Sequence, residues 1–214
     1  MKTKLHLTIL LAFFGLSVNG QTWSPVGTGV DSSVQSSTIF NGELYVGGKF
    51  FTTGGNPASQ IARWDGTAWT ALGTGVSGSS GGGVIALTVY NGELIAAGLF
   101  TTAGGAPASN IAKWNGTSWS ALGSGMNNFV QSLAIYNGEL IAGGGFTIAG
   151  GISANNIAKW NGTSWSSLGT GMNSEVRALA VYNTELYAGG SFTIADGAPV
   201  NYIAKWNGAS WSSV

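Results

Sequence analysis

Short runs of alternating apolar and polar residues, separated by turn residues, make up the chain beyond its first 20 residues. Val130 to Tyr136 (VQSLAIY) alternates with the period of two expected of a strand with one buried face. The turn Asn137-Gly138 is a strong hairpin signal and leads into a second run, Glu139 to Phe146. After the loop TIAGGISAN come a third run, residues 156–160, the turn NGTS and a fourth run, residues 165–169. The pattern predicts four short antiparallel strands and no helix in this part of the chain.

This four-strand pattern recurs along the chain. Tryptophans open successive units at intervals of 46, 50, 46 and 46 residues, at Trp23, Trp69, Trp119, Trp165 and, for a partial fifth unit, Trp211. A four-stranded unit of about 40–50 residues in tandem is typical of a propeller. We therefore predict an all-β fold, a β-propeller built from four repeats of about 46 residues.

Two features of the unit predict how it packs. A second tryptophan lies five residues before each opening one, as in Trp160 and Trp165, so each pair should face across a hairpin. Glycines such as Gly143, Gly144 and Gly189 interrupt the second strand, where a glycine usually marks close backbone approach. We expect neighbouring blades to meet at these glycines.

Both ends of the repeat region contain a copy of the same strand. A propeller closes when a strand from one terminus completes the last blade, and residues 22–30 are suited to this. Residues 211–214 already begin the same strand, so one copy is surplus. Either the ring closes on four blades with one end displaced, or the ring is incomplete and needs further blades or a second copy.

Residues 1–20 read as a signal peptide. Lys2 and Lys4 precede an apolar stretch, residues 5–18, and Val18 and Gly20 are the small residues before the cleavage point. The stretch is too short to span a bilayer comfortably. We expect a mature domain of residues 21–214 that is secreted, at the cell surface or in the periplasm, with no transmembrane segment.

Composition narrows the chemistry. Charged residues are 7% of the chain, against about 25% in an average domain. There is no cysteine, and the single histidine, His6, lies in the signal peptide, so thiol chemistry and the commonest general base are absent from the mature chain. Removing residues 1–20 leaves six basic and eight acidic side chains, which argues against nucleic acid as a partner. We expect no metal and no cofactor, and no Ca²⁺ loop of recognised spacing occurs.

The remaining charges follow the repeat. Glutamates occupy one turn position of every unit and a lysine or arginine another, at Glu43, Glu93, Glu139 and Glu185, and at Arg63, Lys113, Lys159 and Lys205. Catalytic acids need unlike environments, whereas these positions are equivalent. We interpret them as structural pairs or as a solvated edge, and we predict that the protein is not an enzyme.

Three motifs support a family resemblance. The run GELYVGGKFFTTGG…IARWDGTAWTALGTGV carries the elements GG-x-F, A-x-W-[ND]-G and W-x-x-L-G, which recur throughout residues 23–214. The chain resembles the kelch-like β-propeller repeats of secreted bacterial surface proteins, and is also similar to the propeller ectodomain of fungal cortical marker proteins. The resemblance implies export, often more blades and a carboxyl-terminal sorting domain, but no particular activity.

The units differ most on one face of the predicted propeller. The loops between the second and third strands and those between blades should share a face, and both sets vary, whereas the opposite loops (FNGE, YNGE, WNGTSW) hardly change. Binding residues concentrate on variable loops held by a rigid frame. Arg177 aligns with Gln35, Ile85 and Gln131, near the mouth of the channel. The candidate ligand-binding residues are Asp31, Asn56, Asn127, Asn128, Asn173, Glu175, Arg177 and Asp196.

These observations favour a secreted or cell-surface, non-enzymatic binding or adhesion module whose partner is a glycan or a surface protein. Two alternatives stay open. The chain is a structural repeat fragment of a longer surface protein without its own activity, or it is a glycan-active propeller enzyme.

Overall fold

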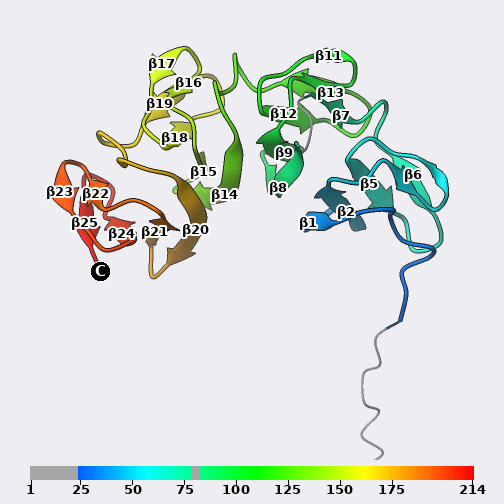
Figure 1. Ribbon diagram of the computed structural model, residues 1–214, viewed down its shortest axis with the longest axis horizontal. Helices are drawn as coiled ribbons and strands as arrows, with labels where there is room; N and C mark the ends of the chain where they lie inside the picture. Colours follow the sequence, from blue (N-terminus) through cyan, green and yellow to red (C-terminus); the bar gives the residue numbers. More distant parts are fainter. Residues whose placement is uncertain (1–23, 79–81) are drawn as a thin grey trace, which may run out of the picture.

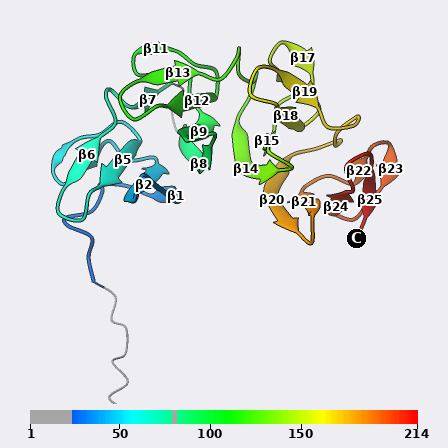
Figure 2. The ribbon, with the colours of Figure 1, turned by 180° about the vertical axis from the view of Figure 1, so that it is seen from behind.

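The computed structural model describes residues 24–78 and 82–214, and these residues form an all-β propeller arc. The predicted signal peptide, residues 1–20, and Trp23, which opens the first predicted unit, lie outside the described residues. Four antiparallel four-stranded sheets follow one another as blades, and the arc is open between the first and the fourth (Figures 1 and 2). The described residues contain no helix, and so none long and apolar enough to cross a membrane.

Each blade has the same strand order, from the inside of the arc to the outside. Blade 1 is β1 (Val34–Phe40), β2 (Glu43–Gly48), β5 (Ile61–Trp64) and β6 (Trp69–Ala71). Blade 2 is β8 (Gly83–Tyr90), β9 (Glu93–Leu99), β12 (Ile111–Trp114) and β13 (Trp119–Ala121). Blade 3 is β14 (Val130–Tyr136), β15 (Glu139–Gly144), β18 (Ile157–Trp160) and β19 (Trp165–Ser167). Blade 4 is β20 (Val176–Tyr182), β21 (Glu185–Gly190), β24 (Ile203–Trp206) and β25 (Trp211–Ser213).

The segment expected to be a plain loop between the second and third strands contains a small hairpin. In blade 3 the turn residues Gly150 and Gly151 both have positive φ (61° and 85°), as a tight two-residue hairpin turn requires. The hairpins are β3 (Thr52–Thr53) with β4 (Asn56–Pro57), β10 (Thr102–Ala103) with β11 (Ala106–Pro107), β16 (Ile148–Ala149) with β17 (Ile152–Ser153), and β22 (Ile194–Ala195) with β23 (Ala198–Pro199); β7 (Val76–Ser77) adds to β10.

The core lies between the blades. Three equivalent clusters each join one blade to the next, and a fully buried phenylalanine follows the second strand of every blade, at Phe50, Phe100, Phe146 and Phe192. A Cβ added to Gly47 would come within 2.3 Å of Val84 in the next blade, and one on Gly143 within 2.5 Å of Val176. The expected close approach at strand-two glycines is confirmed at these positions.

Tryptophans link the blades through hydrogen bonds as well as burial. Each pair faces across its hairpin with ring centroids 5.3–5.5 Å apart, as predicted. The indole N–H of Trp165 donates to the carbonyl of Leu122, which ends the preceding blade, over 3.0 Å. The same bond joins Trp119 to Leu72 and Trp211 to Leu168.

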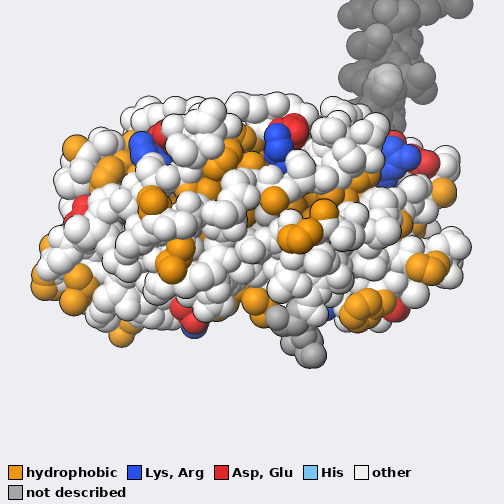
Figure 3. Space-filling model, turned by 90° about the horizontal axis from the view of Figure 1, so that it is seen from above, with side chains coloured by type: hydrophobic (Ala, Val, Ile, Leu, Met, Phe, Trp, Pro, Cys, Tyr) orange, Lys and Arg blue, Asp and Glu red, His pale blue; other side chains and the backbone are white. Residues whose placement is uncertain are grey.

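The registered charges pair within each blade, as predicted. The separations are 3.0 Å for Arg63–Glu43, 2.8 Å for Lys113–Glu93, 2.9 Å for Lys159–Glu139 and 3.1 Å for Lys205–Glu185. Figure 3 shows such blue and red side chains side by side on an otherwise largely uncharged surface. Half-exposed pairs of this kind contribute about 0–1 kcal/mol each to stability.

Replacing Trp165 by Phe tests the inter-blade hydrogen bond. The substitution leaves the buried carbonyl of Leu122 without its donor, so we expect the free energy of unfolding to fall by ~1–3 kcal/mol more than for Trp160→Phe. Trp160 is a matched control because it is equally buried (7% exposed against 6%) and its indole nitrogen donates no such bond. Urea unfolding measures both, and equal losses would contradict the assignment.

Replacing Asp65 by Asn tests an acid-sensitive turn. The backbone N–H groups of Ala68 and Thr67 bond the Asp65 carboxylate and lower its pKa from 3.8 to about 2. Because this pKa is lower in the folded protein, the bonds stabilise it fully above about pH 4, and that contribution is lost as the pH falls towards 2. Asn115, Asn161 and Asn207 make the same bonds without titrating.

We therefore expect Asp65→Asn to match the natural protein in unfolding midpoint at pH 7 and to exceed it at pH 2.5. Urea titrations at the two pH values make the comparison. An identical acid-induced loss in both proteins would show that this carboxylate contributes nothing.

A candidate binding site at the channel mouth

The loop face is held together by pairing between its two sets of loops. Single bridges join Val30 to Thr53, Met126 to Ala149 and Met172 to Ala195, and β7 pairs with β10 at the equivalent place. Each hairpin therefore packs against the segment that enters its own blade. The expectation that these two loop sets share a face is confirmed.

Three of the predicted site residues occupy one repeat position and hold the hairpins. The Oδ1 atom of Asp31 accepts hydrogen bonds from the backbone N–H groups of Phe51 and Thr52, 2.8 and 3.0 Å away. The bonds from Thr52 and Phe51 lower the pKa of Asp31. Asn127 and Asn173 make the same two bonds in blades 3 and 4. Each of these side chains thus has one oxygen committed to loop structure.

Asn56 bonds within its own loop, whereas Asn128 and Asp196 join separate segments of their blades. Asn56 donates to the carbonyl of Gly54 and Asn128 to that of Gly145. Asp196 stands where other blades have a glycine, with φ 49°, and its carboxylate accepts from the backbone N–H groups of Thr170 at 2.6 Å and Trp211 at 3.0 Å.

Glu175 and Arg177 are the two predicted charges that lie together. They form an ion pair of 3.3 Å, and 64% of the Arg177 side chain and 41% of that of Glu175 are exposed. They belong to blade 4, at the inner edge of the loop face. The structure therefore does not gather the eight predicted residues into one site but distributes them over blades 1, 3 and 4.

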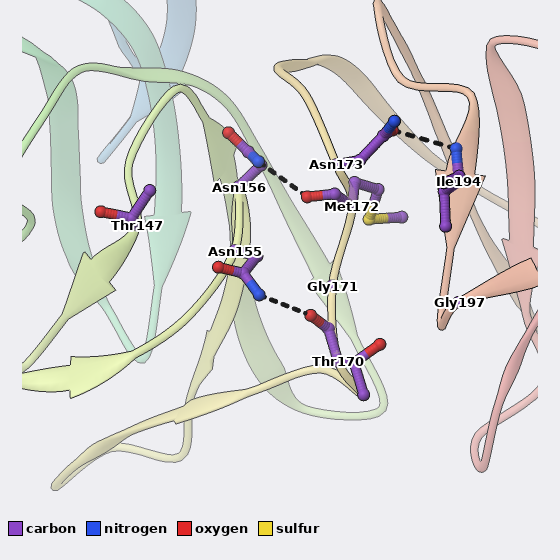
Figure 4. A pocket seen from close by; sticks show the side chains of 9 residues that line it. All are labelled: Thr147, Asn155, Asn156, Thr170, Gly171, Met172, Asn173, Ile194 and Gly197. Atoms are coloured by element: carbon purple, nitrogen blue, oxygen red, sulfur yellow. Dashed lines mark hydrogen bonds between the residues drawn. The ribbon is translucent and has the colours of Figure 1, made fainter.

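A cavity of about 410 Å³ lies on this face between blades 3 and 4 (Figure 4). Its polar side chains join the two blades: Asn155 and Asn156 donate to the carbonyls of Thr170 and Met172 over 2.9 and 2.8 Å. Asn110 makes the equivalent bond to Met126 one blade earlier. Because these amides already serve the junction, we regard this cavity as a feature of blade packing.

A second cavity, of about 280 Å³, lies at the inner edge where blades 1, 2 and 3 meet. Its lining consists of Gln35, Lys49, Gly82, Gly83, Ile85, Leu99, Phe129 and Gln131. We call this cavity the channel mouth. It brings Gln35, Ile85 and Gln131 together, the residues that align with Arg177.

Three repeat positions build the channel mouth. In order from blade 1 to blade 4, the position before the first-strand valine holds Ser33, Gly83, Phe129 and Glu175. The position after that valine holds Gln35, Ile85, Gln131 and Arg177, and the position before the buried phenylalanine holds Lys49, Leu99, Gly145 and Ser191. Among the four blades these positions hold four, three and four different residues, although the valine, glycine and phenylalanine beside them are identical in every blade.

The backbone explains why these positions meet. A register shift in the pairing of the first two strands lies at Gln35, Ile85, Gln131 and Arg177, where each blade carries a bulge. Bulges re-aim a side chain away from the regular alternation. The N–H of Lys49 also donates to the carbonyl of Ser33, and that of Gly145 to Phe129, so the first and third positions are neighbours.

The channel mouth combines three kinds of chemistry. Gln35 and Gln131 offer amide donors and acceptors, and Ile85, Leu99 and half-buried Phe129 offer apolar surface. Lys49 is exposed and takes part in no ion pair with any described residue. Within residues 24–78 and 82–214, no three His, Cys, Asp or Glu side chains come together as metal ligands would. The arrangement is suited to binding a partly apolar ligand that carries a negative charge.

Sequence reasoning found only part of this site. It identified the position of Gln35 and Arg177, but missed Lys49, Leu99 and Phe129. The second strand was expected to continue to Phe146, which placed the Lys49 position inside a strand, whereas β15 ends at Gly144. The available signal was the variation of this position between units, next to an invariant phenylalanine.

Comparison with known proteins places the fold. No protein-family model matches the chain, and no curated protein matches it. Among solved structures, the computationally designed Ika4 protein is 16% identical with a TM-score of 0.53, over 87% of this chain and 98% of that one. The WD40 repeats of RRP9 are 15% identical with a TM-score of 0.55, over 88% of this chain and 52% of that one. The designed Ika8 protein is 17% identical with a TM-score of 0.50, over 82% of this chain and 46% of that one.

The chain thus spans about half the length of the RRP9 repeats and of Ika8. At these identities the likeness concerns the fold alone. Together with the repeated four-stranded sheets, it shows that this chain is a β-propeller repeat protein.

Proposed function

We propose that the protein is an exported, non-enzymatic binding module whose channel mouth binds an exposed protein segment carrying both an acidic and an apolar side chain. The observation that carries the proposal is the contrast at the inner edge of the blades. At three positions the residue changes along the blades, with only Gln35 and Gln131 alike, while the valine, glycine and phenylalanine beside them do not change. A purely structural repeat has no need for such varied side chains around one cavity next to invariant neighbours.

Binding fits the site better than catalysis. The glutamates of the blades are paired with lysine or arginine in equivalent surroundings, so no two of them offer the unlike environments of an acid and a base. Glu175, the acid at the inner edge, is held by Arg177. These pairings support a non-enzymatic role, against the alternative of a glycan-active enzyme.

A protein ligand is supported by the mixture of side chains. Lys49 attracts the carboxylate of the ligand. Gln35 and Gln131 hydrogen-bond the backbone amides of the ligand on either side of its acidic residue. Ile85, Leu99 and Phe129 together receive an apolar side chain. Interfaces between proteins combine an apolar centre with polar groups at the rim in this way. A glycan is the second candidate, favoured by Phe129, whose half-buried ring next to amide groups suits a sugar face.

Export rests on the sequence. The charged start, the apolar stretch and the small residues before Gln21 support a cleaved signal, and the motifs shared with kelch-like propellers support a secreted or cell-surface location, or the periplasm. A structural fragment of a longer surface protein remains the alternative, and it predicts no ligand at the channel mouth.

Reversing the charge of Lys49 tests the proposal. We would screen purified residues 21–214 on an array of acidic–apolar peptides and on a glycan array, and then compare Lys49→Glu and Phe129→Ala with the natural chain. For a peptide bound at the channel mouth, Lys49→Glu should weaken binding at least about tenfold, and raising the salt concentration should weaken binding to the natural chain. Ser120→Ala, an exposed change on the outer strand of blade 2, should bind as the natural chain does.

The outcome separates the candidates. Glycan binding that depends on Phe129 but not on Lys49 would replace the protein ligand by a sugar. Binding that both channel-mouth variants leave intact, or that Ser120→Ala weakens equally, would overturn the site.

A further inference from the structure

The two open ends of the arc carry the two halves of one interface. Between blades 1 and 2, a forward face of blade 1, made of Phe40, Tyr45 and Ile61, is covered by the rear face of blade 2, and these residues are only 4, 3 and 0% exposed. The same positions are occupied by Tyr90, Ile95 and Ile111 in blade 2 and by Tyr136, Ile141 and Ile157 in blade 3. These residues are likewise buried, in the next two junctions. One interface therefore recurs three times within the chain.

Blade 4 presents the same forward face without a cover. Its residues at these positions are Tyr182, 65% exposed, half-buried Tyr187, and Ile203, 42% exposed. Gly189 also differs from its equivalents. A Cβ there would meet nothing nearer than 3.9 Å, whereas the strand-two glycines of blades 1 and 3 touch a valine of the next blade. The space that a following valine fills elsewhere is open here.

Blade 1 presents the complementary rear face, also uncovered. Val34 is 47% exposed, although its equivalents Val84, Val130 and Val176 are fully buried by the preceding blade. Trp64 and Trp69 are only half-buried, and line an open cavity of about 270 Å³. The rear face thus keeps the side chains that pack in the three internal junctions.

One exchange in blade 1 preserves this apolar face. Across the first two strands the other blades pair a leucine with an alanine, as in Leu87 with Ala96. Blade 1 pairs Ser37 with Val46, so the larger apolar side chain has moved to the neighbouring strand.

Backbone groups at the two ends also match. In each internal junction an N–H at the start of a blade donates to a loop carbonyl of the blade before it: Val76 to Ser59, Met126 to Ser109 and Met172 to Asn155, over 3.0–3.1 Å. Val30 and Asn201 stand at these two positions. In the described part of the chain neither makes this bond.

We propose that the forward face of blade 4 binds the rear face of blade 1 in a second copy of this chain, and that the reciprocal contact closes two arcs into one ring. The second copy is the partner because a single chain already contains both halves of the interface. Two identical contacts related by a two-fold axis satisfy both ends at once. The arc covers about half of the RRP9 repeats and of Ika8, so two arcs account for a propeller of that length.

The junction between copies has one steric requirement. Trp69 donates its indole N–H to the carbonyl of Val26, as Trp119 does to Leu72. Val26 therefore already occupies the place into which Val214, 66% exposed, would extend from the other copy. Val214 of each copy must turn aside when the ring closes. This proposal does not depend on the function of the channel mouth.

Sedimentation velocity and light scattering of purified residues 21–214 test the ring. We expect a single species of twice the chain mass. Val34→Glu on the rear face and Ile203→Glu on the forward face should each weaken dimerisation at least about 100-fold, because closure would bury an unpaired carboxylate. Ile152→Glu is the matched control, since Ile152 is also 42% exposed but lies on a hairpin of blade 3, and it should remain dimeric.

Mixing distinguishes a lost interface from a misfolded chain. Val34→Glu keeps an intact forward face and Ile203→Glu an intact rear face, so an equimolar mixture should form heterodimers through one contact although neither variant dimerises alone. A monomeric natural chain, a ladder of larger assemblies, or a dimer that survives both substitutions would overturn the proposal.

Discussion

The structure depends on the packing of each blade against the next. A single four-stranded sheet here is apolar on both faces, so it cannot bury its own side chains, and stability comes from the junctions. Those junctions are tight: Val84 and Val176 lie where any side chain on Gly47 or Gly143 would collide with them. The indole bond from Trp165 to Leu122 then sets the distance between the outer strands.

This constraint decides which residues are free to change. Positions that face a neighbouring blade repeat almost without variation, as Phe100 and Phe146 illustrate. Even exposed loop residues are constrained where their polar atoms hold a hairpin, as with Asn127 and Asn173. Side chains at the inner edge, such as Lys49, neither pack between blades nor hold a hairpin. They are therefore free to differ, and residues of several chemical types meet at the channel mouth.

The structural features that recur in every repeat could be predicted from the sequence. Strands, Asn-Gly turns, tryptophan pairs and pairs of glutamate with lysine or arginine each occur in every unit, so an error of interpretation in one unit is corrected by the other three. The candidate binding site differs from this, because each of its three positions holds at least three different residues among the four blades. Variation marked Asp31 and Arg177 alike, but only the structure separates Asp31, bonded to Phe51 and Thr52, from Arg177, which pairs with Glu175 and does not line the channel mouth. The contact of Lys49 with Ser33 depends on where β2 ends, and strand ends are poorly encoded in sequence.

The ends of the arc follow from the same packing rule. Repeat proteins that stand alone usually carry terminal units with a polar outer face. Blade 4 has instead Tyr187, whose hydroxyl bonds Glu185, in the arrangement that Tyr45 makes with Glu43 in blade 1. Tyr45 is 3% exposed because blade 2 covers it. This face of blade 4 copies a covered face, down to this hydroxyl, and the likeness supports our proposal that it is an interface.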